Sequence, residues 1–288
     1  MGNGKKDGSI SRLQLKREII ENNVYGVDIE KGAIDIARLR FWLSIVVDSE
    51  KPDPLPNFDY KFMQGNSLIE SFEGVDLSKI FNTPKEGEQF ALVFDGENEA
   101  LELLKSSIQK YFRNSNHKQK VAMRATINEA VKTFIHCKSM DNYELHRRLE
   151  EIDCSANQEF FLWHIWFKDI FDKGGFDIVI GNPPYFKYEG AIKGEIETIR
   201  KISELEIAFG GKLNAYKLFL AISINKICKD RGVISMIFQN SFIADQQATL
   251  LRKEVINHHR IITIDSFPER DSKKKRVFPS VKMVFVYC

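Results

Sequence analysis

Apolar residues recur along the chain at two spacings, one typical of helices and one typical of strands. Short runs rich in β-branched and aromatic residues predict strands at residues 23–29, 60–64, 176–182, 232–238, 260–267 and 281–287. Apolar residues at every third or fourth position predict helices at residues 11–22, 31–47, 214–229 and 245–257. Strands that alternate with helices are typical of a largely parallel sheet covered on both faces. We therefore expect an α/β protein built as a three-layer sandwich.

Residues 76–155 differ from the segments on either side. They are rich in charged residues and helix formers, and no strand stands out among them. We interpret this region as a mostly helical insert. It divides the chain into a first part of the core at 1–75, the insert at 76–160 and a second, catalytic part of the core at 161–288.

Bulk composition limits the class of protein. The 288 residues are 43% hydrophobic and 28% charged, which is enough for a sizeable core. A net charge of +2 is too small to attract nucleic acid by itself, so such binding would depend on local basic clusters. The 4 cysteines form no C-x-x-C pair, and the longest apolar run, at 160–167, is too short to cross a bilayer. We expect a reduced cytoplasmic protein, with no metal site and no membrane partner.

The sequence GFDIVIGNPPY (175–185) ends a predicted strand abruptly. Pro183 and Pro184 cannot donate ladder hydrogen bonds, so Asn182 and Tyr185 are expected on a stiff turn at the carboxyl end of the strand. Ligands bind at that end in open α/β sheets. The Asn182 amide oxygen and the Pro183 carbonyl oxygen can accept hydrogen bonds from one exocyclic amino group, and Tyr185 can stack on a planar ring. Such acceptors help a conjugated amino nitrogen to react without a strong base. A simple strand-ending turn is the alternative.

GFDIVIGNPPY resembles the catalytic motif of adenine-N6 DNA methyltransferases, which use S-adenosylmethionine (SAM). The other segments resemble those of the large type II, type IIG-like enzymes that fuse methylation with restriction. These segments are YGVDIEKGAIDIARLRFWLS, FMQGNSL, FFLWHIWFKDIF, NAYKLF and RVFPSVKM, in the same order. The resemblance covers most of residues 23–288 and implies a Rossmann-like SAM-dependent methyltransferase sheet. The implied activity is methyl transfer from SAM to the N6 amino group of an adenine in double-stranded DNA, within a restriction-modification system.

The resemblance also implies roles around the target base. Asn182 and the Pro183 carbonyl would hold the target amino group, and Tyr185 would stack on an adenine flipped out of the duplex. Phe278 would be the aromatic residue on the other side of the base, and an ordinary core position is its alternative because the chain has 22 phenylalanines. A run of basic residues just before Phe278 would contact DNA phosphates, and its alternative is a solvated charged surface. The basic residues are Arg270, Lys273, Lys274, Lys275 and Arg276.

For the cofactor, the resemblance implies residues that follow predicted strands and one residue on a predicted helix. Asp28 would accept hydrogen bonds from the SAM ribose hydroxyls, with Ile29 packing on the cofactor adenine. Asn66 would contact the amino edge of that adenine, and Phe219 would cover its other face. Each of these residues also has a purely structural alternative. Asp28 could be a solvated aspartate at a strand end, Asn66 could only form a turn, and Phe219 could be a core residue.

Some expected parts of such an enzyme are not found in the sequence. We find neither the first strand nor its glycine-rich loop, which would resemble DPACGSGxF, and the sequence ends at Cys288, where the resemblance leads us to expect a target-recognition domain to continue. We therefore expect the central part of a larger enzyme, which by itself binds SAM weakly, has little sequence-specific DNA binding and is weakly active or inactive. The alternatives are a non-catalytic DNA-binding or assembly module and a protein glutamine methyltransferase. The latter class also carries NPPY but lacks the long insert, the RVFPS aromatic and the basic loop.

Overall fold

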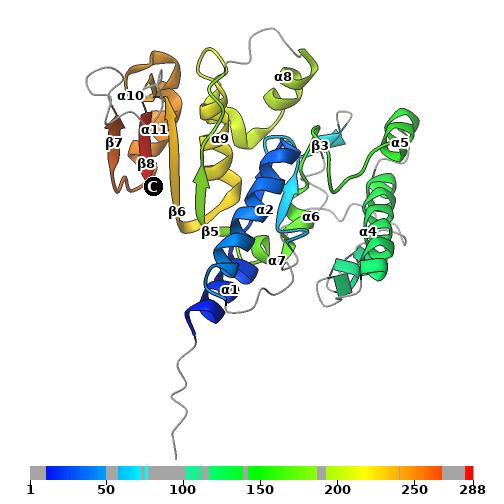
Figure 1. Ribbon diagram of the computed structural model, residues 1–288. Coiled ribbons are helices and arrows are strands. Elements are labelled where there is room, and N and C mark those ends of the chain that lie inside the picture. The colour runs from blue at the N-terminus through cyan, green and yellow to red at the C-terminus, as the bar shows by residue number, and fades with distance from the viewer. Residues whose placement is uncertain are drawn as a thin grey trace, which may run out of the picture. The chain divides into compact units, whose positions relative to one another are not determined.

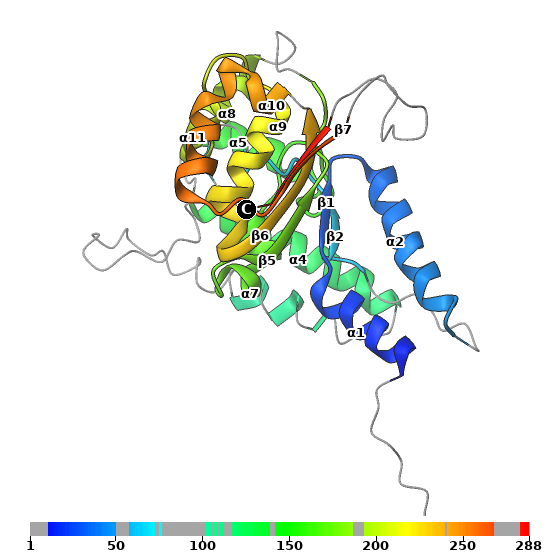
Figure 2. The same ribbon diagram turned by 90° about the vertical axis from the view of Figure 1, so that its left-hand side faces the viewer.

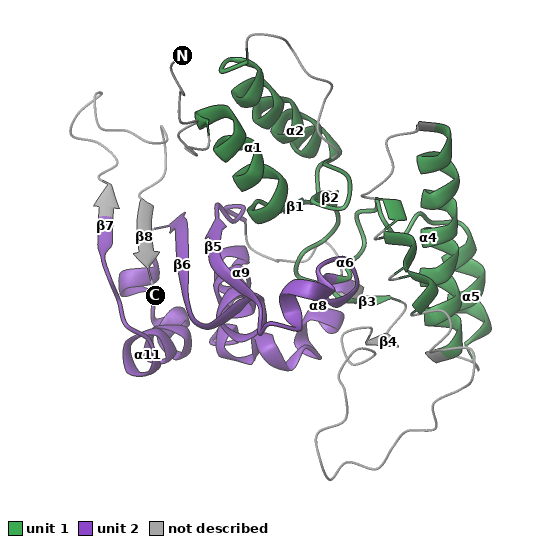
Figure 3. Ribbon diagram, turned by 90° about the horizontal axis from the view of Figure 1, so that it is seen from below, with its two compact units in different colours: residues 1–162 green, residues 163–288 purple. Residues whose placement is uncertain are grey.

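The computed structural model describes most of the chain. The described residues are 11–49, 58–72, 75–76, 102–104, 106–108, 110–111, 117–138, 142–186, 193–239, 241–267 and 283–287. The chain divides into two compact units, residues 1–162 and 163–288 (Figure 3). Both mix helices with small sheets (Figure 1), which confirms the predicted α/β class. None of the described helices is both long enough and apolar enough to cross a bilayer.

The first unit begins with two helices and a short parallel strand pair. α1 (Arg12–Asn23) begins after Ser11, whose hydroxyl accepts a hydrogen bond from the Gln14 N–H at 3.1 Å. α2 (Lys31–Val46) connects β1 (Gly26–Asp28) to its parallel partner β2 (Phe62–Gln64), as Figure 2 shows. A parallel pair needs such a crossover, because the chain must return to the end of the sheet where β1 begins before β2 can run in the same direction. The buried cluster beneath these elements consists of Ile20, Ile34, Ile45, Phe58 and Phe62.

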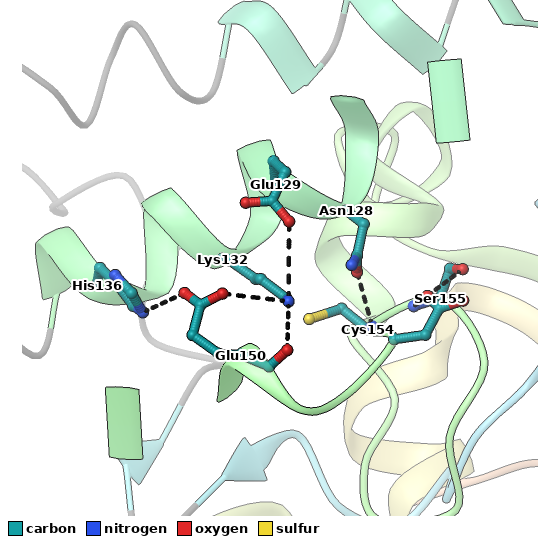
Figure 4. Close-up of polar contacts among 8 residues, drawn as sticks. Asn128, Glu129, Lys132, His136, Glu150, Cys154 and Ser155 are labelled. Carbon is teal, nitrogen blue, oxygen red and sulfur yellow. Dashed lines mark hydrogen bonds and ion pairs between the residues drawn. The ribbon is translucent and has the colours of Figure 1, made fainter. Parts of the chain in front are cut away.

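Two further helices of the first unit lie within the region predicted as an insert. α4 (His117–Lys138) and α5 (Tyr143–Glu150) are joined by a buried lysine (Figure 4). Lys132 Nζ donates to the Glu150 carbonyl oxygen at 3.0 Å, and it lies 3.6 Å from Glu150 Oε2 and 3.8 Å from Glu129 Oε1. The paired carboxylates allow this ammonium group to be buried, because an isolated charge there would be costly.

Cys154 lies beside this lysine and is almost fully buried (Figure 4). Its backbone N–H donates to Asn128 Oδ1 at 2.9 Å. Burial raises the pKa of the Cys154 thiol to about 12, so the thiol is protonated and unreactive at neutral pH. The cluster therefore holds α4 and α5 together and does not provide a nucleophile.

Asp59 connects α4 to the strand pair. Its carboxylate accepts a hydrogen bond from the Tyr111 hydroxyl and pairs with Arg124 at 2.6 Å and with Arg38 at 3.5 Å. Arg38, on α2, also donates to the Phe62 carbonyl at 2.6 Å. Burial and the bond to Asp59 raise the pKa of Tyr111 to about 12, which keeps its hydroxyl a donor. One carboxylate thus fixes α2, the start of β2 and α4 to each other.

The second unit is built on a four-stranded mixed sheet in the order β5-β6-β8-β7. β5 (Phe176–Gly181) runs parallel to β6 (Cys228–Gln239). β8 (Met283–Tyr287) is antiparallel to both β6 and β7 (Ile264–Phe267). Because β5 and β6 are parallel, their carboxyl ends lie at the same edge of the sheet.

Helices cover one face of this sheet, as Figure 2 shows. α9 (Ala215–Ile222) packs against β6, where Tyr216 stacks on Phe238 with ring centroids 5.2 Å apart. α11 (Thr249–His258) lies beside it. The shorter helical segments are α6 (Trp163–Trp166), α7 (Lys168–Phe171), α8 (Lys193–Arg200), η2 (Ser203–Ala208), η3 (Ser223–Ile227), α10 (Ser241–Ala244) and η4 (Gln246–Ala248).

The structure corrects several predicted elements. The helix predicted at 214–229 is observed as α9 followed directly by the π-helical turn η3 (Ser223–Ile227), and β6 begins at Cys228 because that residue pairs with Phe176 of β5. The strand predicted at 260–267 begins only at Ile264. β3 (Ser71–Phe72) and β4 (Val75–Asp76) form a short antiparallel pair that was not predicted, since such short strands carry no recognisable alternation. Among the described residues, the strands form separate small sheets where one continuous sheet was expected.

A pair of stacked histidines joins α4 to α5. The rings of His136 and His146 stack with centroids 4.1 Å apart, and His136 Nε2 lies 3.8 Å from Glu150 Oε1. Burial lowers the pKa of His136, and His146 and Lys132 lower it further, while Glu150 and Glu129 oppose the shift. The folded protein therefore binds a proton at His136 less readily than the unfolded chain does.

We expect His136→Gln to reduce the loss of stability on acidification. As the pH falls below the ordinary histidine pKa of about 6.5, the unfolded chain takes up a proton at His136 before the folded protein does. The free energy of unfolding therefore decreases until the pH has fallen below the lowered pKa of His136 in the folded protein. Thermal unfolding should therefore show a smaller fall in Tm between pH 8 and pH 5 for His136→Gln than for the unsubstituted protein. His258→Gln, at an exposed histidine that ends α11, is the control. Equal falls in Tm for both variants would contradict this explanation.

Candidate functional site

The strand β5 presents Asn182 at the carboxyl end of the parallel pair. Pro183 is buried beneath the turn, whereas Asn182 and Pro184 are exposed. The Tyr185 hydroxyl donates to Asn182 Oδ1 at 2.6 Å. Tyr185 is half-buried, and burial raises its pKa, so its hydroxyl is a hydrogen-bond donor at neutral pH. The structure therefore brings Asn182 and Tyr185 into direct contact immediately after β5.

The segment after this turn is bonded to the start of α9. The Ala215 N–H donates to the Phe186 carbonyl at 3.1 Å. This bond places NPPYF next to NAYKLF, two motifs that are separated along the chain by α8 and η2. In α9, all of which the structure describes, Phe219 is the only residue that is not buried. Part of its ring is therefore accessible at the motif that the resemblance singled out.

Asn214 and Lys217 lie in the same motif and were not among the predicted residues. Asn214 is 5% exposed and immediately precedes α9. Lys217 is fully buried, and its Nζ donates to the carbonyl oxygens of Gly210 at 3.2 Å and Gln247 at 3.1 Å. Burial lowers the pKa of Lys217. A lysine among apolar neighbours in NAYKLF was the available signal for a buried, hydrogen-bonded amine.

The candidate cofactor residues Asp28 and Ile29 lie at the end of β1. Both are exposed, with Ile29 at 43%. Asp28 Oδ1 accepts from the Glu30 N–H at 2.8 Å, which shapes the turn into α2. The Asp28 carbonyl accepts from the Gly65 N–H at 3.0 Å, and Gln64 Nε2 donates to the Ile29 carbonyl at 3.0 Å. These bonds hold the carboxyl ends of β1 and β2 together.

Asn66 follows β2 at the same edge. It is largely buried, and its Oδ1 accepts from the Leu68 N–H at 3.2 Å, which is the turn-forming contact considered for it. The preceding Gly65 has no room for a side chain. A Cβ there would lie 2.7 Å from the Phe160 carbonyl oxygen and 2.8 Å from the Phe161 ring. The FFLW segment therefore fixes the backbone that carries Asn66.

The predicted residues thus form two sets. Asp28, Ile29 and Asn66 lie in the first unit, at the ends of β1 and β2. Asn182, Pro183, Pro184, Tyr185 and Phe219 lie in the second unit, around the end of β5 and on α9. Phe278 and the basic residues Arg270, Lys273, Lys274, Lys275 and Arg276 lie outside the described residues. Within the described part of the chain, no group of three or more His, Cys, Asp or Glu residues could hold a metal ion.

Comparison with known proteins identifies similar chains. Residues 22–273 match the family described as Eco57I restriction-modification methylase. The chain is also 27% identical over 293 aligned positions to a putative type II restriction enzyme and methyltransferase, RM.MjaORFECS2P, of Methanocaldococcus jannaschii. The alignment covers 83% of this chain and 24% of that relative.

We expect Gly65→Ala to destabilise the protein by about 1–3 kcal/mol, because the added methyl group would overlap the Phe160 carbonyl and the Phe161 ring. Urea unfolding monitored by circular dichroism measures the change. Gly32→Ala is the matched control, since a Cβ at Gly32 of α2 meets no atom within 4 Å and should leave stability equal or slightly higher. Equal free energies of unfolding for the two variants would contradict this prediction, because they would mean that Phe160 and Phe161 move away from the added methyl group without loss of stability.

Proposed function

Because this chain belongs to the Eco57I restriction-modification methylase family, we propose that the intact protein transfers a methyl group from SAM to the N6 amino group of an adenine in double-stranded DNA. The observation that carries this proposal is the turn after β5, where an exposed Asn182 is held in contact with Tyr185. The family supports DNA, rather than a protein glutamine, as the substrate. Parallel strand pairs joined by a helix support a Rossmann-like core, and α4 and α5 support a helical insert.

At the target base, Asn182 and Pro183 act as hydrogen-bond acceptors. Asn182 Oδ1 and the Pro183 carbonyl oxygen each accept one hydrogen from the N6 amino group. Asn182 is exposed and can be reached by a base, and its Oδ1 has a second lone pair besides the one that the Tyr185 hydroxyl uses. These acceptors would increase the electron density on N6 as its lone pair bonds to the methyl carbon, while the bond from that carbon to the sulfonium sulfur of SAM breaks and its electron pair stays on sulfur. The proton that N6 then loses passes to water, so no strong base is needed beside the turn.

The half-buried ring of Tyr185 supplies a face for the adenine. The base must leave the duplex to reach this turn, and stacking on Tyr185 offsets part of the cost of unstacking it from its neighbours. We assign the opposite face of the base to Phe278. The basic run from Arg270 to Arg276 is assigned to contacts with DNA phosphates, which would hold the backbone beside the flipped nucleotide.

The residues at the ends of β1 and β2 fit a nucleoside. Asp28 is an exposed carboxylate that uses Oδ1 for the Glu30 N–H, so Oδ2 is available to the ribose hydroxyls. Ile29, exposed beside it, offers an apolar surface to an adenine ring. Asn66 and the partly exposed ring of Phe219 are assigned to the edge and the other face of that ring. SAM, when bound, supplies an electrophilic methyl group attached to a sulfonium.

The surrounding segments of the longer protein are assigned the remaining tasks. Since the alignment spans only 24% of the Methanocaldococcus jannaschii relative, we assign the glycine-rich cofactor loop and target recognition to parts outside residues 1–288.

Asn182→Ala in the intact protein should abolish methyl transfer while leaving the fold unchanged. The substitution removes an acceptor for the reacting amino group, and loss of one such preorganised group costs about 100- to 1000-fold in rate. Transfer of labelled methyl groups from SAM to unmethylated DNA measures the rate, and circular dichroism verifies the fold. Asn22→Ala, at an exposed asparagine near the end of α1, is the control and should keep the full rate. An Asn182→Ala protein that methylates DNA normally would refute the assignment.

Tyr185→Phe and Tyr185→Ala should separate stacking from hydrogen bonding. Phenylalanine keeps the ring and releases Asn182 Oδ1 from its bond to the tyrosine hydroxyl, so kcat/KM should stay within about threefold of the unsubstituted value. Alanine removes the ring, and losing base–aromatic stacking of about 1–3 kcal/mol should lower kcat/KM by roughly 10- to 100-fold. If both variants are equally impaired, the hydroxyl rather than the ring is the essential group.

A further inference from the structure

Lys217 carries a buried ammonium group that joins two segments distant in the sequence. The residue lies fully buried on α9, and its Nζ donates to the carbonyl oxygens of Gly210 at 3.2 Å and Gln247 at 3.1 Å. Gly210 lies in the loop between η2 and α9, whereas Gln247 lies in η4, after the carboxyl end of β6. The ammonium group therefore holds the loop before α9 against the segment that follows β6.

A lysine is costly at this position. Burial lowers the pKa of Lys217, although the negative charge of Asp245 opposes the shift. No carboxylate in the described part of the chain forms an ion pair with it, whereas the buried Lys132 is paired with Glu129 and Glu150. A methionine has a similar length and would be buried without losing the hydration of a charge. The lysine instead provides two charge-assisted hydrogen bonds, each about twice as strong as a neutral one.

The two segments that Lys217 joins approach each other very closely. A Cβ at Gly210 would lie 2.8 Å from the Gln247 carbonyl oxygen, and one at Gly211 would lie 2.8 Å from Gln247 Cγ. Gly211 also has a positive φ of 88°, which favours glycine. The Lys212 N–H donates to Gln247 Oε1 at 2.9 Å. The two glycines therefore permit the contact that the Lys217 ammonium group then fixes.

The segment after β6 is itself fixed to the helices. Arg252 of α11 donates from Nη1 to the Phe242 carbonyl at 2.8 Å and also to the Asp245 carbonyl. The Phe242 ring packs edge-on against Tyr216 of α9, with ring centroids 6.4 Å apart. Two cationic side chains, Arg252 and Lys217, thus hold the backbone carbonyl oxygens between α10 and η4. The loop before α9 is attached to a well-held segment.

The start of α9 connects Lys217 to the candidate site. The Ala215 N–H, two residues before Lys217, donates to the Phe186 carbonyl at 3.1 Å. Phe186 directly follows Tyr185, whose hydroxyl donates to Asn182 Oδ1. The segment after β5 and the segment after β6 are thus both bonded to the first turn of α9. Because β5 and β6 are parallel, these two segments leave the same edge of the sheet.

We propose that Lys217 is a positioning residue for methyl transfer, which holds the start of α9 so that the turn carrying Asn182 and Tyr185 is fixed where the target adenine arrives. The inference rests on the proposed function and adds to it a residue that touches neither the base nor the cofactor. Lys217 acts through the loop before α9 and through the bond from Ala215 to Phe186. A displacement of about 1 Å between reacting groups can slow a reaction about 100-fold, so losing this lysine should slow the chemical step more than it weakens binding.

The first test is Lys217→Met in the intact protein, assayed well below its melting temperature. Methionine keeps the length of the side chain and removes both hydrogen bonds. We expect the single-turnover rate of methyl transfer to unmethylated DNA to fall by about 10- to 100-fold, with the Kd values for DNA and SAM within about threefold of the unsubstituted values. Hydrogen exchange of the peptide that contains Ala215, measured by mass spectrometry, should become faster because the start of α9 is less firmly held.

Lys132→Met is the matched control. It removes another buried lysine, which joins α4 to α5, so it should lower the melting temperature and leave the single-turnover rate and the exchange at Ala215 unchanged. Lower melting temperatures with unchanged rates in both variants would show that Lys217 only stabilises the fold, and the inference would be wrong. Equal losses of rate in both variants would also overturn it, because they would reflect a general loss of structure.

Gln247→Ala tests the same contact from the other segment and disturbs the fold less. It removes the acceptor for the Lys212 N–H and keeps the backbone carbonyl that Lys217 binds. We expect a smaller loss of single-turnover rate, about three- to tenfold, with faster exchange at Ala215. If Lys217→Met does not fold, this variant decides, and an unchanged rate in Gln247→Ala would then contradict the inference.

The outcomes separate this inference from the proposed function. If the unsubstituted protein transfers no methyl group from SAM to DNA, the proposed function is wrong and the inference fails with it. If the unsubstituted protein methylates DNA and Lys217→Met keeps the full rate, only the inference is wrong. A slower rate without faster exchange at Ala215 contradicts the connection through α9 and also overturns the inference.

Discussion

Two consecutive residues without backbone N–H groups, Pro183 and Pro184, determine how the chain leaves β5. A strand paired in parallel with β6 would otherwise extend its ladder, and its terminal side chains would alternate between the faces of the sheet. The prolines prevent that and restrict the backbone dihedrals of the turn. Asn182 is consequently exposed at the end of the ladder, Pro183 is buried beneath it, and Tyr185 folds back to bond Asn182. The Phe186 carbonyl is then positioned to receive the first N–H of α9.

The first unit depends on a different kind of interaction. Charge connects α4 to the strand pair at Asp59, where a carboxylate is bonded to a tyrosine and paired with two arginines. Lys132 does the same between α4 and α5, with two glutamates around one ammonium group. Removing the glutamates around Lys132 would leave its buried ammonium group without an opposite charge, so this contact is specific to one arrangement of the two helices. The helical region is thereby fixed to the same strands that carry Asp28 and Asn66.

Local signals account for the features that could be predicted from sequence. The end of β5 follows from its prolines, and the shared edge of β1 and β2 follows from the rule that parallel strands end on the same side. Features that depend on distant partners were not predictable. Cys228 begins β6 because it pairs with Phe176, although the polar residues after it are typical of a turn. The partners of Lys217 depend on how α9 packs, which no spacing in NAYKLF indicates. The roles of the candidate residues toward ligands remain predictions.

If the turn after β5 binds a base, as we propose, the bond between Tyr185 and Asn182 has a consequence for selectivity among bases. In the free protein the amide oxygen already accepts from a hydroxyl, so an incoming base can share or replace that donor without exposing a bare acceptor. A base with an amino group meets this requirement. Hypoxanthine or guanine would instead direct a carbonyl oxygen at the same place, where two sets of lone pairs repel and the asparagine loses its donor. Deaminated adenine in DNA would therefore be rejected by the polarity of a single contact, since the rings have nearly the same shape.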